Sequence, residues 1–390
     1  MTKDPKSETK GPIDWILLGT TMALIAAGLM MVYSSTSFLG YSYYGDPAYY
    51  FKRQLMWLGI GVVAMFITSQ LDYRHWKKVS IVVMAITLFM LLFLVLFKKD
   101  ERHLLGQSIS PVELAKLAVV IYIGHWLASK GDLLRKLPYG LLPFTIMVGV
   151  VAGLVLAQPD ISEAIVIVLV ALAMFFLAGA DLLQFVVGIV GGIGAFAFVI
   201  NRIPQAMERL EPFFVEWRNP LTSSNDQLRH GLLALGSGGL LGLGPGSGRM
   251  KYGWLSAAHT DSIFGIVGEE IGLVGCLVII SLFALLVYRG LRIAILAPDA
   301  FGRLMASGIT CWIGVQALIN MAVVTGTMPF TGIALPFISL GGSSLLTCMI
   351  GVGLMLSISR SVSTEPARVE ARTVRTERRR TSNVEAGTLE

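Results

Sequence analysis

The stretch DSIFGIVGEEIGLVGCLVIISLFALLVY (261–288) joins three acidic residues to a long apolar run. Within residues 263–288 the only charged side chains are Glu269 and Glu270. A helix needs about 20 apolar residues to cross a hydrocarbon core of about 30 Å. The stretch therefore predicts a membrane-spanning helix that carries two acids and is preceded by a third, Asp261. Ionisable residues inside membrane spans are costly, so they mark candidate functional sites.

Runs of the same kind recur along the chain, and they define the predicted fold. They occupy residues 13–35, 54–71, 79–97, 111–129, 139–157, 161–179, 182–200, 263–288, 303–325 and 338–358. The composition agrees, because only 14% of the 390 residues are charged, against about 25% in soluble domains, and the mean hydropathy is +0.70. We expect an all-α membrane protein with ten transmembrane helices, the membrane domain covering residues 12–360.

Lysine and arginine in the loops predict the orientation, because cytoplasmic loops are enriched in them. With ten spans both termini share a side, and that side holds 19 of these residues against 5 in the short loops opposite. We therefore expect a cytoplasmic N-terminal tail (1–11) and a basic, disordered cytoplasmic tail (361–390). The large loop between helices 7 and 8 (201–262) is then extracytoplasmic, and so is Asp261.

The large loop contains a glycine-rich segment, ALGSGGLLGLGPGSG (234–248), followed by Arg249 and Lys251. Glycine lets backbone approach a ligand closely, so one interpretation is a cradle for phosphate groups, with the cations beside it. The alternative is an interfacial loop whose cations meet lipid headgroups. The spacing alone does not separate the two.

Four ionisable residues lie in or at the fourth and sixth spans. Glu113 and Lys116 are three residues apart, so they share a helix face and can pair. The pair either holds helices together or lines a cavity. Asp160 and Glu163 lie at the start of the sixth span, where acids complement the helix dipole.

Asp261 has two interpretations from sequence alone. Thr260 could cap the following helix, with Asp261 in its first turn. Alternatively, Asp261 is a base whose pKa is raised by the nearby Glu269 and Glu270. Residues 320–346 contain prolines and glycines that interrupt a helix, and irregular backbone at membrane depth lines a cavity or is buried in protein. We expect a cavity at the outer mouth of the tenth span.

Together these motifs resemble the SEDS family of cell-wall polymerases, which includes FtsW, RodA and SpoVE. Segments SPVELAK (110–116), QPD (158–160), TDSIF with EE (260–270) and LPFISLGGSS (335–344) carry the resemblance. It departs from the family pattern at Ser256-Ala257, where Pro-Glu is usual, and at Ser262, where Phe is usual. Residues 49–57 and the extended termini look closer to the FtsW branch.

The resemblance implies an inverting glycosyltransferase that polymerises lipid II during cell division, with Asp261 as general base. The substrate-binding residues that it implies are Lys251, Arg249, Gln227, Glu113, Lys116, Asp160 and Ser343. It fixes no cofactor and leaves Mg²⁺ or Mn²⁺ open. The implied partners are lipid II, undecaprenyl pyrophosphate, a class B penicillin-binding protein and other division proteins, with no nucleic acid. The implied location is the bacterial inner membrane at the division septum. The alternatives are a lipid II flippase, an elongation polymerase of the RodA type, and a scaffold that recruits the penicillin-binding protein.

Overall fold

The structure is a computed structural model that describes residues 11–97, 110–158, 160–200, 226–329 and 331–362. Its helices are α1 (Trp15–Tyr44), α2 (Tyr49–Gln70), α3 (Arg74–Phe97), α4 (Pro111–Lys130), η1 (Gly131–Arg135), α5 (Leu141–Leu156), α6 (Ile161–Leu177), α7 (Leu182–Ile200), α9 (Asp226–Ser237), α10 (Ile263–Leu296), α11 (Ala300–Val324) and α12 (Gly342–Val362). Nearly all of both predicted tails, and residues 201–225 of the large loop, lie outside the described residues.

Ten of these helices correspond to the ten predicted spans, which confirms the all-α membrane fold. Seven are long and apolar enough to cross a membrane, and α5, α6 and most of α7 form shorter apolar helices. The described part of the large loop adds α9, an amphipathic helix that sequence reasoning did not anticipate.

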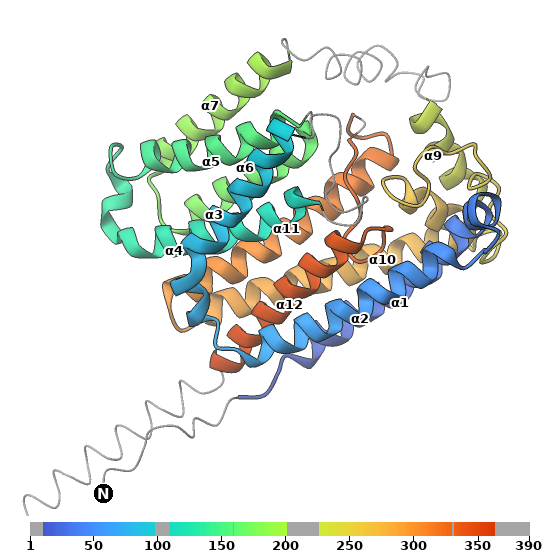
Figure 1. Cartoon of the computed structure of the whole chain (residues 1–390), viewed down its shortest axis with the longest axis horizontal. Helices are drawn as coiled ribbons and strands as arrows, with labels where there is room; N and C mark the ends of the chain where they lie inside the picture. The colour runs from blue at the N-terminus through green and yellow to red at the C-terminus, as the bar shows by residue number, and fades with distance from the viewer. Residues whose placement is uncertain (1–10, 98–109, 159, 201–225, 330, 363–390) are drawn as a thin grey trace, which may run out of the picture.

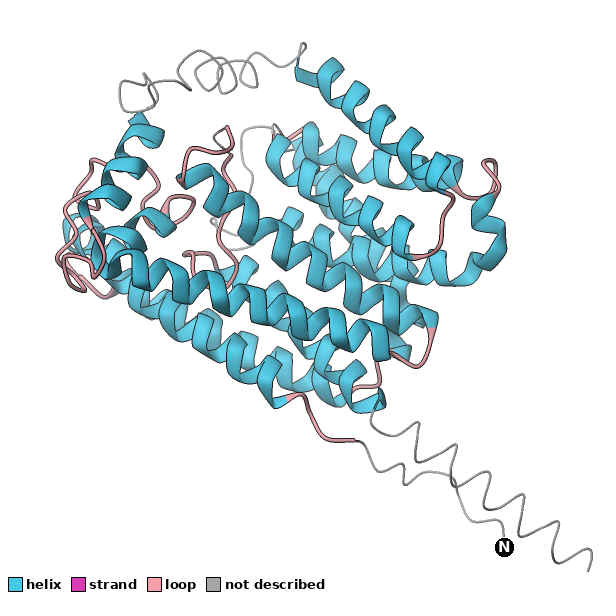
Figure 2. Cartoon of the chain, turned by 180° about the vertical axis from the view of Figure 1, so that it is seen from behind, coloured by secondary structure: helices cyan, strands magenta, loops and turns pink. Residues whose placement is uncertain are grey.

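The two ends of the described chain meet at one end of the helix bundle (Figures 1 and 2). There Pro12 and Val362 line a common cavity, and Arg289 near the end of α10 forms an ion pair with Asp14. The start of α10 lies at the opposite end, beside α9 (Figure 1). Asp261 is therefore on the other side of the bundle from both ends, as the ten-span topology requires.

Small residues let the helices approach closely at their crossings, as is common in membranes. A Cβ atom added at Gly353 of α12 would overlap the Thr68 hydroxyl group and the Met65 carbonyl group of α2. Gly61 of α2 similarly faces the sulfur atom of Met349. The α2–α12 contact therefore depends on glycine from both helices.

The helix α10 is interrupted at Gly272, whose backbone is non-helical with φ 74° and ψ −169°. The glycine-rich segment of the large loop inserts here. Its Leu243 and Gly244 amides donate to the carbonyl oxygens of Glu269 and Glu270, at 2.9 and 3.0 Å. In return, the amides of Leu273 and Val274 donate to the loop carbonyls of Gly239 and Leu240, at 2.9 and 3.1 Å.

This exchange satisfies the backbone groups that the break would otherwise leave unpaired in an apolar environment, where each unpaired group is costly. In a continuous helix the amides of residues 273 and 274 would donate to the carbonyl oxygens of residues 269 and 270. At the break, the loop provides hydrogen-bond partners for all four of these groups. The glycines therefore allow two backbones to meet, a role that neither interpretation of the loop from sequence included.

Replacing Gly272 with alanine is expected to destabilise the protein by about 2–6 kcal/mol. Its backbone conformation is essentially restricted to glycine, with a strain of about 1–3 kcal/mol, and overpacking adds about 1–3 kcal/mol. The new Cβ would overlap the Gly242 nitrogen and come 2.6 Å from the Leu240 oxygen. Thermal unfolding of the purified protein in detergent measures the loss. Gly59→Ala is the control, because nothing lies within 4 Å of its Cβ position.

Candidate active site

Asp261 lies two residues before α10, in a turn that α11 holds in place. The side-chain amide of Asn320 donates to the Asp261 carbonyl oxygen at 2.8 Å. Asp261 is half-buried, whereas Gly332 in the segment before α12 is exposed. The carboxylate atom Oδ2 lies 3.4 Å from the position of a Cβ built on Gly332. The carboxylate therefore borders an exposed glycine that leaves room beside it.

The turn that precedes Asp261 is fixed by hydrogen bonds from the segment before α12. Ser339 Oγ donates to the Thr260 carbonyl oxygen at 2.6 Å, and the Leu340 amide donates to the His259 carbonyl oxygen at 2.9 Å. Burial lowers the pKa of His259, which favours a neutral ring near Asp261. The backbone that carries the acid is thus held from two sides.

The predicted cap of α10 is wrong. Ser262, not Thr260, occupies the N-cap position, and its side chain makes no capping hydrogen bond. The Thr260 and Ser262 amides instead donate to the carbonyl oxygen of Ala257, at 3.0 and 3.2 Å, and Ala257 has a positive φ of 52°. This turn ends before the helix begins, so Asp261 precedes the first helical turn.

Gln227 of α9, which the resemblance implied as a substrate-binding residue, contacts the same turn. Its side-chain amide donates to Ser262 Oγ at 2.8 Å and to the Ser256 carbonyl oxygen at 3.1 Å. Both partners are positions at which this chain departs from the family pattern. Gln227 therefore links α9 to the turn that carries Asp261.

A second cluster lies inside the bundle, where α4, α6 and α11 meet. Lys116 Nζ lies 3.0 Å from Glu113 and 2.9 Å from Glu163. It also donates to Gln316 Oε1 at 2.8 Å and lies 5.7 Å from the ring centre of Trp312. The predicted Glu113–Lys116 pair is confirmed. The third member, Glu163 from α6, was not predicted as a partner.

Two further predicted residues bind at the starts of α6 and α4, two helices that contribute to this cluster. Asp160 caps α6 by accepting from the Glu163 amide at 3.4 Å, and Ser343 Oγ accepts from the Ser110 amide at the start of α4, at 3.2 Å. Lys116 is 2% exposed and two carboxylates surround it. In this structure the Lys116 ammonium group is therefore bound by protein side chains.

Gln316 and Asn320, one helical turn apart on α11, connect the two clusters. Gln316 accepts from Lys116 and donates to the Ala334 carbonyl oxygen at 3.0 Å. Asn320 donates to the Ile333 carbonyl oxygen at 2.7 Å as well as to Asp261. Sequence reasoning missed both, although two amide side chains four residues apart in an apolar span were a readable signal.

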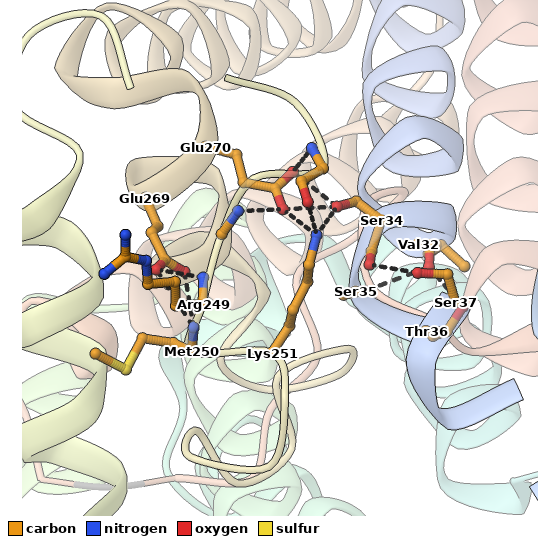
Figure 3. Close-up of polar contacts among 12 residues, drawn as sticks. Val32, Ser34, Ser35, Thr36, Ser37, Arg249, Met250, Lys251, Glu269 and Glu270 are labelled. Atoms are coloured by element: carbon orange, nitrogen blue, oxygen red, sulfur yellow. Dashed lines mark hydrogen bonds and ion pairs between the residues drawn. The ribbon is translucent and has the colours of Figure 1, made fainter. Parts of the chain in front are cut away.

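Glu269 and Glu270 form a third cluster, shown in Figure 3. Glu269 accepts from the Arg249 and Met250 amides, at 2.7 and 3.2 Å. Glu270 accepts from Ser34 Oγ at 2.6 Å and from Lys251 Nζ at 2.7 Å. Both carboxylates therefore hold the glycine-rich loop against α10.

The two predicted cations of the large loop, both near this cluster, differ in their burial. Lys251 is 3% exposed and also donates to Ser34 Oγ and the Gly246 carbonyl oxygen, at 2.8 and 2.7 Å. Arg249 is exposed, and the contact of its backbone with Glu269 leaves the guanidinium at the surface. The seven predicted binding residues and Asp261 thus divide among three clusters.

Among the described residues, no group of three or more His, Cys, Asp or Glu side chains could hold a metal ion. A Mg²⁺ ion that bridges substrate phosphates needs only one or two protein carboxylates. Asp261 beside exposed Gly332 offers one such carboxylate, so the residues present fit a substrate-bridging ion better than a protein cage.

A family model described as cell cycle protein, FtsW/RodA/SpoVE, matches residues 14–364. The chain belongs to the FtsW/RodA/SpoVE family. The probable peptidoglycan glycosyltransferase FtsW of Trichlorobacter lovleyi is 36% identical over 364 residues, which cover 90% of this chain and 94% of that protein. Stage V sporulation protein E of Bacillus subtilis is 36% identical over 356 residues, covering 89% and 97%.

The fold of this family member also matches a chain from a solved peptidoglycan synthase complex that coordinates polymerization and crosslinking. The TM-score is 0.71 at 26% identity, and the match covers 90% of this chain and 98% of that chain. Sequence and fold agree over nearly the whole membrane domain.

Proposed function

We propose that this protein is a peptidoglycan glycosyltransferase that polymerises lipid II into glycan strands during cell division. The observation that carries the proposal is the Asp261 carboxylate, held beside exposed Gly332 in a chain that matches glycosyltransferase FtsW over 90% of its length. The similar FtsW proteins and stage V sporulation protein E favour division over elongation.

In the proposed reaction Asp261 is the general base. It takes the proton from the 4-hydroxyl of the acceptor GlcNAc, whose oxygen attacks the anomeric carbon of the donor MurNAc. The bond from that carbon to undecaprenyl pyrophosphate breaks, and the pyrophosphate leaves with the electron pair. A single displacement inverts the anomeric carbon, in line with one base rather than a pair of carboxylates that forms a covalent intermediate.

The leaving pyrophosphate needs positive charge nearby. Of the three predicted cations, the exposed Arg249 is the candidate that the structure leaves available, because Lys116 and Lys251 are buried in ion pairs. Glu113, Lys116, Asp160 and Ser343 then act on the substrate only through the shape of the bundle. A bound Mg²⁺ or Mn²⁺, with Asp261 as a ligand, would neutralise the same phosphate groups.

The proposed setting is the bacterial inner membrane at the division septum, with both termini cytoplasmic and Asp261 outside. The proposed partners are a class B penicillin-binding protein, which the synthase-complex match supports, lipid II, its undecaprenyl pyrophosphate product, and other division proteins of the membrane.

Labelled lipid II, incubated with the purified protein and its class B partner, tests the proposal. We expect a ladder of glycan polymers that grows with time. Liposomes that contain the protein and labelled lipid II provide the second arm, which measures transfer between leaflets. Transfer without any polymer in either arm would favour the flippase and overturn the proposed function.

A further inference from the structure

We propose that Thr331 and Asn320 form a hydroxyl-binding subsite that orients the acceptor sugar against Asp261. The inference rests on the proposed function, because it names how that site holds its acceptor. It begins from two buried polar atoms that have no hydrogen-bond partner among the described residues, Asn320 Oδ1 and Thr331 Oγ1. Both belong to segments that contact Asp261.

The orientation of the Asn320 amide is fixed by its neighbours. The side chain is 1% exposed, and its nitrogen lies 2.8 Å from the Asp261 carbonyl oxygen and 2.7 Å from the Ile333 carbonyl oxygen. Two carbonyl oxygens can be satisfied only by the two protons of the amide nitrogen. The oxygen Oδ1 is therefore the atom that still needs a donor.

Thr331 lies on the other side of the same contact. It precedes Gly332, the exposed residue beside the Asp261 carboxylate, and it is two residues from Ile333, whose carbonyl oxygen Asn320 binds. The segment from Thr331 to Ile333 and the Asp261 turn are thus tied together by one asparagine. The Thr331 hydroxyl can both donate and accept.

Other atoms without a hydrogen bond have different surroundings. The carboxylate oxygens of Glu113 and Glu163 face Lys116 in ion pairs. Gln158 and Gln184 also leave an amide oxygen without a hydrogen bond, but their amide nitrogens bind the carbonyl oxygens of Leu91 and Arg135 and not the Asp261 turn. Arg360 binds the Ser69 carbonyl oxygen and the Gln70 side chain. His230, on α9, packs its ring against Trp254 of the large loop. Asn320 and Thr331 are the pair that contacts the segment around the candidate base.

The chemistry that suits these atoms is that of a sugar. A sugar hydroxyl can donate to Asn320 Oδ1, and the same or a neighbouring hydroxyl can accept from the Thr331 hydroxyl. Buried polar groups are normally paired, so a hydroxyl-rich acceptor would complete both. Its next hydroxyl would then face Asp261, the group that removes the proton. Thr331 is a binding residue here, and Asn320 both binds the acceptor and positions the base.

The test compares Thr331→Val with Thr331→Ser in lipid II polymerisation with the class B partner present. Valine keeps the shape and removes the hydroxyl, whereas serine keeps it. We expect Thr331→Val to raise the half-saturating lipid II concentration about tenfold, equivalent to about 1.4 kcal/mol, with a smaller change in kcat. Thr331→Ser should stay within about twofold of the unaltered protein.

Thr327→Val is the matched control. Thr327 lies in the same segment, is exposed, and donates to the Ala322 carbonyl oxygen at 2.9 Å. It should leave the half-saturating concentration unchanged. The melting temperature of Thr331→Val should also be unchanged, because its hydroxyl has no protein partner among the described residues.

Two outcomes separate this inference from the proposed function. The subsite would be overturned, and the base left in place, if Asp261→Asn lost polymerisation while Thr331→Val kept the normal half-saturating lipid II concentration. Water would then bind Asn320 Oδ1 and Thr331 Oγ1. Normal polymerisation by Asp261→Asn would overturn the base assignment itself. A selective rise for Thr331→Val that serine reverses supports the subsite.

Discussion

Polymerisation of lipid II is expected to fall by about 10²–10⁴-fold when Asp261 is replaced with asparagine, the range that a positioned general base contributes. Asparagine has nearly the same shape but cannot take the proton of the attacking hydroxyl. The carbonyl oxygen that Asn320 holds belongs to the backbone, so the turn should keep its position. The measurement is the initial rate of polymer formation with the class B partner present.

The stability of this variant should remain near that of the unaltered protein, which separates lost chemistry from lost fold. Asp226→Asn is the control, because Asp226 is an exposed acid at the start of α9 whose ion pair with Arg229 is at the surface. It should retain full activity. An Asp261→Asn protein that forms polymer at the normal rate would show that another group is the base.

The spans and the intrahelical pair could be predicted because their signals are local. Hydropathy over about 20 residues locates a membrane helix, and three-residue spacing places Glu113 and Lys116 on one face. The third member, Glu163, comes from another helix. No local rule states that α4 and α6 meet at that depth, so its sequence position suggested only a favourable helix start.

The structural role of the glycine-rich loop could not be predicted from sequence for a related reason. Its composition indicates backbone that approaches something closely, but not what it approaches. The structure places Gly242 against the Glu270 carbonyl group and the Gly248 amide 3.3 Å from the Glu270 carboxylate, contacts that join residues more than twenty positions apart. The loop belongs to the α10 break, and only the tertiary fold reveals this.

Replacing Lys251 with methionine is expected to destabilise the protein by about 3–5 kcal/mol. Removing one partner of a buried ion pair leaves an uncompensated charge, with a cost of this size. Lys251 Nζ and Glu270 Oε1 are 2.7 Å apart, with side-chain exposures of 2% and 1%. Thermal unfolding in detergent measures the effect.

The double variant Lys251→Met/Glu270→Gln removes both charges and should recover most of that stability, because paired removal of a buried ion pair is often nearly neutral.

Arg249→Gln is the comparison. The Arg249 side chain is exposed, so its loss should change the free energy of unfolding by no more than about 0.5 kcal/mol while lowering polymerisation if it contacts the pyrophosphate. A stable Lys251→Met protein with impaired polymerisation would contradict the structural role and return Lys251 to the substrate. The expected pattern, unstable at 251 and stable at 249, follows because one cation holds the loop to α1 and α10, whereas the other faces the surface.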